Sequence, residues 1–372
     1  MLSTEGPTAS GSAPRSAVII GAGIVGASLA HALRSRGVDV RIVAGNGAKA
    51  SDVPVAIAQP VMGRHASASP LRVGAWRHAC RLIEDVAPDA VLSRGLLRFT
   101  TDEKTATRWR DRCAVLSVTV ASWYPAARCL DLVPRLTPET CGGIWIPDAL
   151  ALDLERVVRG LLEGVPLVRG DVQAMERTEH GASVKLSDET VLTADVVIVA
   201  AGTGTAGLLD AFDPTLELPW RGTLAGEVVR ARATAPESMV GERGQIVPLG
   251  AGIVSLTASQ RPDGQATDAD EASVAELLQR YAQTLPENAA PVVLETWVGQ
   301  RATTLDAHPI VGPIDDDRRF WVCSGMGSRG VIFGTFASEK LAAELCGDNS
   351  VIPAEWGPFR RAVRHPGRPA LG

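Results

Sequence analysis

The stretch AVIIGAGIVG at residues 17–26 decides the fold of this chain. Its first four residues are apolar and mostly β-branched, which is typical of a buried strand, and three glycines follow. Residues 27–36 then have a helical pattern that ends at Gly37, and residues 38–43 form a second apolar run. Strand, glycine-rich turn, helix and strand in this order predict a βαβ unit of the dinucleotide-binding type.

The glycines of this turn have distinct roles in such a unit. Gly21 permits the tight turn, Gly23 lets the backbone approach a pyrophosphate, and Gly26 lets the helix pack closely on the strand. The N-terminus of the helix then presents free N–H groups and the positive end of its dipole to the phosphates. We therefore assign Gly21, Gly23, Ile24, Val25 and Gly26 to cofactor binding.

One residue expected of this unit is missing. Its second strand normally ends in Asp or Glu, about 20 residues after the glycines, and that carboxylate accepts hydrogen bonds from the adenosine ribose. Here the strand is followed by Ala44, Gly45, Asn46 and Gly47. Either Asn46 accepts one of these bonds or the backbone alone holds the ribose. Both alternatives predict binding weaker by about 1–3 kcal/mol, the scale of one charge-assisted hydrogen bond.

Length, composition and charge indicate a globular protein and argue against a nucleic acid partner and a metal site. The chain has 372 residues, of which 45% are hydrophobic and 21% charged, so it is long enough for two globular domains or for one large domain with an insertion. Its net charge is −5, which opposes binding to an anionic polymer, and we expect no nucleic acid partner. The six cysteines lack the spacing of a metal site, so we expect reduced thiols and no metal.

The sequence carries no recognisable targeting or membrane signal. Residues 1–15 are rich in Ser, Thr, Gly and Pro and lack the apolar core of a signal peptide, so we expect a disordered tail there. The longest apolar run, residues 196–201, is far shorter than the roughly 20 residues needed to cross a bilayer. We expect no membrane span and a cytoplasmic location.

The rest of the chain alternates between strand and helix patterns. Residues 142–147 predict a strand followed by a turn. The run ADVVIVAAG at 194–202 predicts a fully buried parallel strand that delivers a glycine. Near the end, a strand predicted at 318–323 leads into a glycine-rich turn at 325–330, which precedes a helix predicted from Val331 to Leu345. A second strand, turn and helix of this kind predicts a second site for an anionic group.

Four patches taken together point to a family. They are GAGIVG at 21–26 with Ala50, Ser51 and Pro60 after it, ADVVIVAAG at 194–202, Arg221-Gly222, and QRATTLDAHPIVG at 300–312 followed by GMGSRG at 325–330. In this order they resemble the FAD-dependent D-amino acid oxidase superfamily, which includes glycine oxidase, sarcosine oxidase and the oxidase half of the bifunctional enzyme that modifies tRNA wobble uridine. Thr223 departs from the pattern, since the family usually has Arg-Gly-Gln at 221–223.

The resemblance implies FAD as the cofactor. In the family, the N–H groups of the C-terminal glycine turn lie at the flavin N1/C2=O edge, whose negative charge grows on reduction, and a helix dipole there favours hydride acceptance. Beyond the first glycine turn, we assign these residues to FAD: Asn46, Ser51, Val172, Ala201, Gly202, Gly325, Gly327, Ser328, Arg329, Gly330 and Val331.

Arg301 is the residue that the resemblance assigns to substrate and catalysis. It matches the family position whose guanidinium pairs with an amino acid carboxylate, and the guanidinium fork suits a planar carboxylate. Sarcosine oxidases link the flavin to a cysteine just upstream, but no cysteine occurs between Arg232 and Trp321, so we expect noncovalent FAD. The same stretch lacks the lysine that sarcosine oxidases use for oxygen, so the electron acceptor is O2 or an unidentified oxidant, and dehydrogenase behaviour stays open.

We predict an α/β fold with a discontinuous FAD-binding domain, built on a Rossmann-like parallel sheet, and a substrate domain built on an antiparallel sheet with helical excursions. The FAD-binding domain is assigned to 16–75, 150–210 and 301–346, the substrate domain to 76–149 and 211–300, and a solvated C-terminal tail to 347–372.

The expected reaction is oxidation of a C–N bond in an amino acid or secondary amine, with hydride transfer to flavin N5 followed by imine hydrolysis. Three alternatives remain. An oxidase of the tRNA wobble-uridine type is favoured by GSRG at 327–330 and disfavoured by the acidic charge. A nicotinamide-dependent dehydrogenase explains the missing ribose carboxylate at Ala44 but not the C-terminal glycine turn. The third is a noncatalytic protein with a flavin-binding fold.

Overall fold

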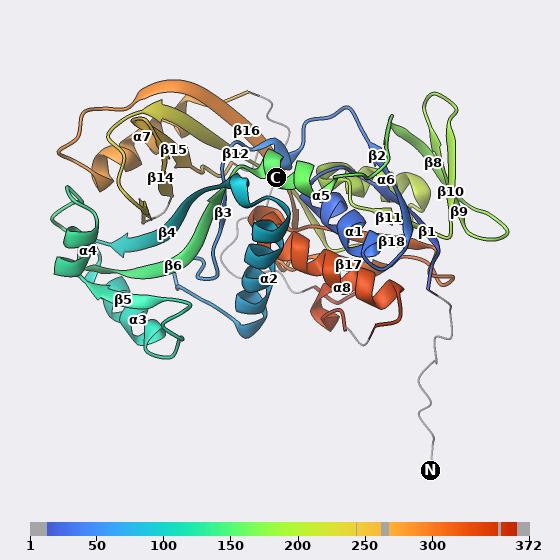
Figure 1. Ribbon diagram of the computed structural model, residues 1–372, viewed down its shortest axis with the longest axis horizontal. Helices are drawn as coiled ribbons and strands as arrows, with labels where there is room; N and C mark the ends of the chain where they lie inside the picture. Colours follow the sequence, from blue (N-terminus) through green and yellow to red (C-terminus); the bar gives the residue numbers. More distant parts are fainter. Residues whose placement is uncertain (1–12, 243, 262–267, 349–350, 363–372) are drawn as a thin grey trace, which may run out of the picture.

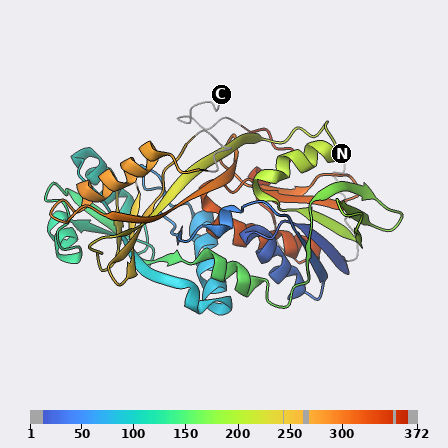
Figure 2. The same ribbon diagram turned by 90° about the horizontal axis from the view of Figure 1, so that it is seen from above.

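The computed structural model describes residues 13–242, 244–261, 268–348 and 351–362. Most of the tail predicted at 1–15 therefore lies outside the described residues. The molecule is elongated, with a largely parallel sheet toward one end and a larger, mostly antiparallel sheet toward the other (Figures 1 and 2). The predicted α/β fold class is confirmed.

The first sheet has six strands in the order β17-β18-β11-β1-β2-β7. Its described strand pairs are parallel except for β17, which runs antiparallel to β18. The strands are β1 (Ser16–Ile20), β2 (Asp39–Ala44), β7 (Leu167–Arg169), β11 (Val196–Val199), β17 (Ile310–Pro313) and β18 (Phe320–Ser324).

Both faces of this sheet are covered. One face packs against helices α1 (Ile24–Arg34), α5 (Leu154–Leu161) and α8 (Thr335–Leu345). The other packs against helix α6 (Thr205–Phe212) and a small sheet of β8 (Val172–Arg177), β9 (Ala182–Leu186) and β10 (Val191–Ala194).

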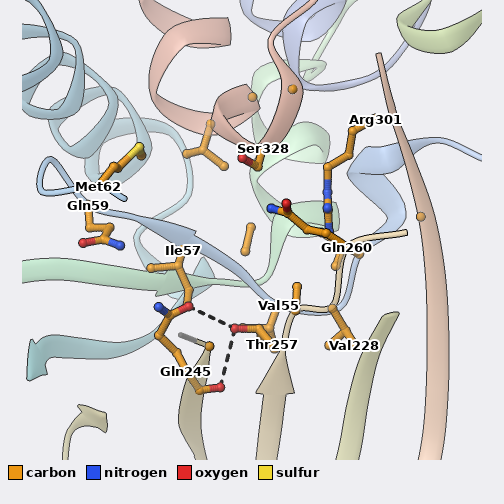
Figure 3. A pocket seen from close by; sticks show the side chains of 18 of the residues that line it. Val55, Ile57, Gln59, Met62, Val228, Gln245, Thr257, Gln260, Arg301 and Ser328 are labelled. Atoms are coloured by element: carbon orange, nitrogen blue, oxygen red, sulfur yellow. Dashed lines mark hydrogen bonds between the residues drawn. The ribbon is translucent and has the colours of Figure 1, made fainter. Parts of the chain in front are cut away.

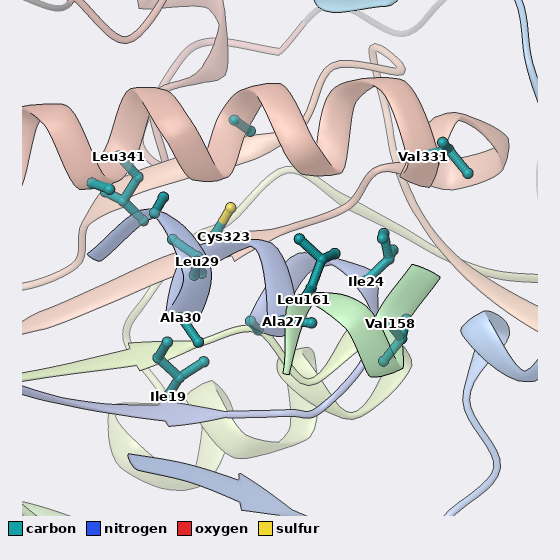
Figure 4. Close-up of a cluster of buried hydrophobic side chains, with 14 of the residues drawn as sticks. Ile19, Ile24, Ala27, Leu29, Ala30, Val158, Leu161, Cys323, Val331 and Leu341 are labelled. Atoms are coloured by element: carbon teal, nitrogen blue, oxygen red, sulfur yellow. The ribbon is translucent and has the colours of Figure 1, made fainter. Parts of the chain in front are cut away.

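The sequence of β1 explains this double burial. Ala17 and Ile19 belong to the core on the helical side, and Val18 and Ile20 belong to the core on the side of the small sheet. Figure 4 shows Ile19 beneath Ala30 of α1 in the first of these cores. A strand buried on both faces needs a continuous apolar run rather than an alternating one, as this sequence predicted.

The second sheet has nine strands, in the order β16-β12-β15-β14-β13-β4-β6-β3 with β5 also paired to β6. Among the described pairs only β13 and β4 run parallel. The strands are β3 (Ala56–Ala58), β4 (Val91–Thr100), β5 (Ser122–Pro125), β6 (Gly142–Leu152), β12 (Trp220–Arg232), β13 (Met239–Gly241), β14 (Gln245–Gly250), β15 (Ile253–Thr257) and β16 (Val292–Thr304). Helices α3 (Glu103–Cys113), α4 (Ala126–Leu132) and α7 (Glu271–Thr284) accompany this sheet, whereas α2 (Pro70–Val86) packs mainly with α5 and α8 in the core of the first sheet.

The turn predicted after the strand at 142–147 is wrong. Strand β6 continues through Pro147 to Leu152 and pairs with β4 on both sides of that proline. The register shifts between Arg94 and Leu96, so Pro147 lies in an irregular part of the ladder. A proline is tolerated in a strand where the ladder asks for no N–H donor.

The strands do not follow the predicted domain limits. Strand β3, within 16–75, pairs with β6 in the larger sheet. Strand β6 itself continues past residue 149 to Leu152, and β16 continues past residue 300 to Thr304. The division of the chain into a cofactor domain and a substrate domain stays a proposal.

The solvated tail predicted at 347–372 needs correction where the structure describes it. Trp356 is fully buried, with its ring edge-on to those of Phe333 and Phe336. Arg360 makes a two-pronged ion pair with Asp306. The sequence suggested a tail because this segment is rich in arginine and proline, but a single buried tryptophan ties it to α8.

Candidate functional site

The first glycine turn joins β1 to α1 at the carboxyl end of the parallel sheet. Gly21 has φ +116°, and a Cβ there would overlap the carbonyl of Ala200. A Cβ on Gly26 would overlap the carbonyl oxygen of Gly21, so the helix lies too close to the strand for any other residue. These contacts agree with the roles expected of both glycines.

The N-terminus of α1 is left open for a ligand. Its N-cap, Gly23, offers no side chain, and the first turn contains no acidic residue. Among the described residues, Ser51 is the side chain that hydrogen-bonds at this end, and its hydroxyl accepts from the N–H of Ile24 at 2.9 Å. Uncapped N–H groups and the helix dipole together favour a phosphate at this position.

A cavity of about 440 Å³ opens at this turn, which we call the dinucleotide cavity. Of the residues predicted to bind cofactor, the N-terminal part of the chain contributes Gly21, Gly23, Ile24, Val25 and Ser51 to its wall. The later parts contribute Val172, Ala201, Gly202, Gly325, Gly327 and Gly330. Segments far apart in the sequence are brought together because β1, β11 and β18 are neighbours in the sheet.

Some predicted cofactor residues do not line this cavity. Gly26 is buried between α1 and β1, as its packing role requires. Asn46 does not line the cavity, and its side-chain amide N–H donates to the carboxylate of Asp171. Arg329 donates to the carbonyl of Ala307 and lies over the ring of Phe333.

The C-terminal glycine turn differs from the predicted helix start at Val331. A 3-10 turn at Gly327–Arg329 leads into a π-helical turn at Gly330–Gly334, and α8 begins at Thr335. No side-chain hydrogen bond caps either turn in the described structure. Single π turns within helices are frequent at functional sites.

A second cavity, of about 790 Å³, adjoins the first (Figure 3). We call it the substrate cavity. Its walls come from the larger sheet and from the C-terminal glycine turn, and they include Val55, Ile57, Val228, Ser328 and Val331. The two cavities share Ile24, Ser51, Arg301, Gly327 and Gly330, so the first glycine turn and the C-terminal glycine turn both lie on their common boundary.

Arg301 lies at this boundary. It stands on β16 opposite Leu224 of β12, and its guanidinium covers Gly226, where any Cβ would collide with it. No hydrogen bond or ion pair joins this guanidinium to another of the described side chains. Burial lowers the pKa of Arg301, and the negative charge of Glu227 partly offsets that effect. An arginine keeps its proton at neutral pH under such conditions, so the cavity holds an uncompensated positive charge.

Glu227 is a site residue that the sequence analysis missed. Its side chain is fully buried, pairs with Arg261 at 2.7 Å and accepts from the hydroxyl of Ser259. Because Arg261 already neutralises Glu227, the guanidinium of Arg301 stays unpaired. A single acid within the apolar strand run at 225–231 was the signal that could have revealed it.

Arg98 is a second site residue that the sequence analysis missed. It lines the substrate cavity, lies over the ring of Trp109 and donates to the carbonyls of Val61 and Gly63. Burial lowers its pKa to about 10. Arg98 therefore fixes the loop at 61–63 along the cavity wall.

Other kinds of site are not found in the part of the chain that the structure describes. No group of three or more His, Cys, Asp or Glu side chains there is arranged to hold a metal ion. Within the same residues, no helix has both the length and the apolar character needed to cross a membrane.

The dinucleotide cavity fits FAD on the criteria that the structure offers. An uncapped helix N-terminus meets the need of a pyrophosphate, and a second uncapped glycine turn lies across the same space. The adjoining substrate cavity is large enough to admit a small molecule beside it.

Comparison with known proteins identifies the family. A family model described as DAO, FAD dependent oxidoreductase, matches residues 16–344. Two curated relatives are named tRNA 5-methylaminomethyl-2-thiouridine biosynthesis bifunctional protein MnmC. The one from Idiomarina loihiensis is 27% identical over 349 residues, which cover 90% of this chain and 56% of the relative. The one from Caulobacter vibrioides is 30% identical over 369 residues, which cover 94% of this chain and 58% of the relative. The chain thus spans just over half the length of these relatives.

Solved structures show the same fold. Glycine oxidase from Geobacillus kaustophilus has a TM-score of 0.81 at 20% identity, covering 94% of this chain and 99% of that chain. Iminodiacetate oxidase from a Chelativorans species has a TM-score of 0.77 at 23% identity, covering 92% of this chain and 98% of that chain. Since the family model matches most of the sequence, this chain belongs to the DAO family of FAD-dependent oxidoreductases, with FAD as its cofactor.

Proposed function

We propose that this protein oxidises a C–N bond of a small amino acid or secondary amine that carries a carboxylate. The observation that carries the proposal is the guanidinium of Arg301, which lies partly buried at the boundary of the two cavities without a partner among the described side chains. Withdrawing a cation from water without a counter-ion is costly unless a ligand supplies the charge. A substrate carboxylate would do so with two parallel hydrogen bonds.

In the proposed reaction, separate groups of residues bind the cofactor and orient the substrate. The glycine turns at 21–26 and 325–330 hold FAD, which supplies the acceptor for two electrons and a hydride. Arg301 fixes the substrate carboxylate, and apolar side chains such as Val55 and Val228 exclude water beside it. Orientation by Arg301 is then the main contribution of the protein to the rate. The proposed reaction requires no protein side chain as a proton acceptor, because the amine enters in its neutral form before hydride transfer.

Anaerobic reduction of the yellow holoprotein tests this proposal. Amines and amino acids would be added one at a time, and bleaching of the flavin absorbance would be followed. We expect bleaching by at least one amine with a carboxylate and slower or no bleaching by the same amine as its amide. If no such compound bleaches the flavin while dithionite does, the proposal fails.

A second candidate is oxidation of an amine on a tRNA nucleoside. The curated relatives are named for tRNA 5-methylaminomethyl-2-thiouridine biosynthesis, and the substrate cavity is larger than a simple amino acid needs. Arg64 lines that cavity and donates to His65, which lies next to Arg108. A cationic rim of this kind would suit a phosphate backbone. The net charge of −5 weighs against it, and we rank it second.

A further inference from the structure

The sequence leaves one cofactor contact unassigned. Strand β2 ends at Ala44, where a dinucleotide-binding unit normally presents a carboxylate to the adenosine ribose. The structure adds that Asn46 does not line the dinucleotide cavity. Neither residue therefore provides an acceptor at this end of the cavity.

Asp171 brings a carboxylate to this place from another part of the chain. It lies in the turn between β7 and β8, and β7 is the strand next to β2. Asp171 lines the dinucleotide cavity together with Ala44 and Gly45. A Cβ added to Gly45 would lie 3.3 Å from Oδ1 of Asp171, so the carboxylate sits directly beside the end of β2.

Two sets of contacts hold Asp171 at this position. The backbone N–H of Gly170 donates to the carbonyl of Ala44 at 3.2 Å, and that of Ser187 donates to the carbonyl of Asp171 at 2.9 Å. The carboxylate itself accepts from the backbone N–H and the side-chain amide of Asn46, at 3.4 and 3.3 Å. These two hydrogen bonds are long and use part of the capacity of two oxygens. No ion pair neutralises Asp171 within the described structure.

We propose that Asp171 is the ribose-binding carboxylate of this protein, supplied from the β7–β8 turn in place of the residue missing from the end of β2. Asn46 orients it rather than binding the cofactor. The position, the charge and the remaining acceptor capacity of Asp171 are what two vicinal hydroxyl groups require. The arrangement also explains how the strand can end in alanine and glycine without loss of the adenosine contact.

Titration of the apoprotein with FAD and, separately, with FMN tests the assignment, with flavin fluorescence as the readout. FMN lacks the adenosine, so a contact to the adenosine ribose affects FAD alone. We expect Asp171→Asn to raise the dissociation constant of FAD by about 10- to 100-fold, the effect of one or two charge-assisted hydrogen bonds, and to leave that of FMN within about twofold. Asp210→Asn, at an exposed aspartate of α6 that does not line the cavity, is the matched control and should change neither constant.

A rescue variant separates ligand binding from a structural role. Ala44→Asp in the Asp171→Asn background restores a carboxylate at the usual position, and we expect it to recover most of the affinity for FAD. Two outcomes overturn the proposal. One is an unchanged dissociation constant of FAD in Asp171→Asn. The other is an equal loss of FAD and FMN affinity, which would mean that Asp171 only supports the turn.

Discussion

Arg301 is the side chain on which the proposed substrate site depends. Its surroundings explain why it is free: Gly226 leaves room for the guanidinium, and Glu227, the nearest acid, is already paired with Arg261. A guanidinium held in this way is ready for a ligand without rearrangement, and such preorganisation is worth more than an additional contact.

Replacing Arg301 with alanine tests its role in substrate binding. The variant loses a two-pronged charged pair in a partly dry site, so we expect kcat/KM to fall by about 30- to 1000-fold, equivalent to roughly 2–4 kcal/mol. Most of the loss should appear in KM, because the carboxylate is bound in the ground state as well. Steady-state kinetics with the best amine substrate measure both constants.

Arg301→Lys serves as the matched variant. An ammonium keeps the charge but not the fork, so we expect it to recover only part of the lost kcat/KM. Flavin content should equal that of the parent in both variants. Parent-like kinetics in Arg301→Ala would remove Arg301 from the substrate site and with it the argument for a carboxylate substrate.

Site residues could be predicted from the sequence where their roles depend only on neighbouring residues in the chain. The roles of Gly21 and Gly26 follow from a turn of a few residues, so the motif alone predicted them. Glu227 and Asp171 contact partners in other segments of the chain, and Asp171 lies 125 residues from Asn46. The spacing of a βαβ motif covers only residues within that unit. It therefore could not predict a ribose-binding carboxylate supplied from residue 171.

At the scale of elements, the segment after α8 is part of the folded core. Trp356 packs against Phe333 and Phe336, and its indole nitrogen is buried without a partner among the described residues. We expect Trp356→Ala to lower the free energy of unfolding by about 3–5 kcal/mol, measured by urea denaturation of the FAD-loaded protein. Trp356→Phe should cost much less, because it keeps most of the ring and removes an unsatisfied N–H. Equal stability of the alanine variant and the parent would place this segment outside the core.

The ion pair between Asp306 and Arg360 ties the same segment to the loop after β16, and it predicts a pH dependence. Burial alone would raise the pKa of Asp306, but the hydrogen bonds and charge of Arg360 hold that pKa below its ordinary value. A carboxyl with a lowered pKa stabilises the fold above its unfolded pKa, about 3.9, and loses that contribution as the pH falls through the folded pKa.

Asp306→Asn tests this pH dependence. We expect it to lower the free energy of unfolding at pH 7 by about 1–3 kcal/mol, and the difference from the parent should shrink below about pH 4. Asp316→Asn, at an exposed position, should follow the parent throughout. A difference that stays constant down to pH 2 would show that the carboxylate charge is not responsible.

Element boundaries were harder to predict than element types. The helical pattern at residues 27–36 predicted α1 close to its observed bounds of Ile24–Arg34, because a helix carries its own periodicity of apolar residues. The π-helical turn at Gly330–Gly334 and the passage of β6 through Pro147 depend on neighbouring segments. No local pattern encodes either of them.

At the scale of the whole molecule, the cofactor site joins segments from nearly the entire chain. The dinucleotide cavity draws on β1, β2, β8, β16 and β18 and on the segment that follows β11, so FAD should bind the folded protein only. At 100 times its dissociation constant, we expect FAD to add about 2.7 kcal/mol to the free energy of unfolding. Thermal unfolding at increasing FAD concentration measures this, and a melting temperature independent of FAD would contradict it.

The same protein should release its flavin on acid precipitation. No cysteine lies between residues 232 and 321, and Cys323, which borders the dinucleotide cavity, is buried with its pKa raised to about 12. A thiol of this kind is neutral and unreactive at pH 7. We expect yellow colour in the supernatant, whereas colour retained in the pellet would indicate a covalent link.

The overall charge of the molecule bears on the second candidate function. Nucleic acid binding depends mainly on cations that displace counterions from phosphates, and this chain has 37 basic against 42 acidic residues. We expect a gel shift with total tRNA to show negligible retention at about 150 mM salt. Retention at micromolar protein, falling steeply as salt rises from about 50 to 200 mM, would contradict this and place the tRNA reaction first.

In that case Arg64→Ala combined with Arg108→Ala should abolish retention, because these side chains form the cationic rim beside the substrate cavity. Retention that survives both substitutions would come from elsewhere on the surface and would say nothing about the reaction.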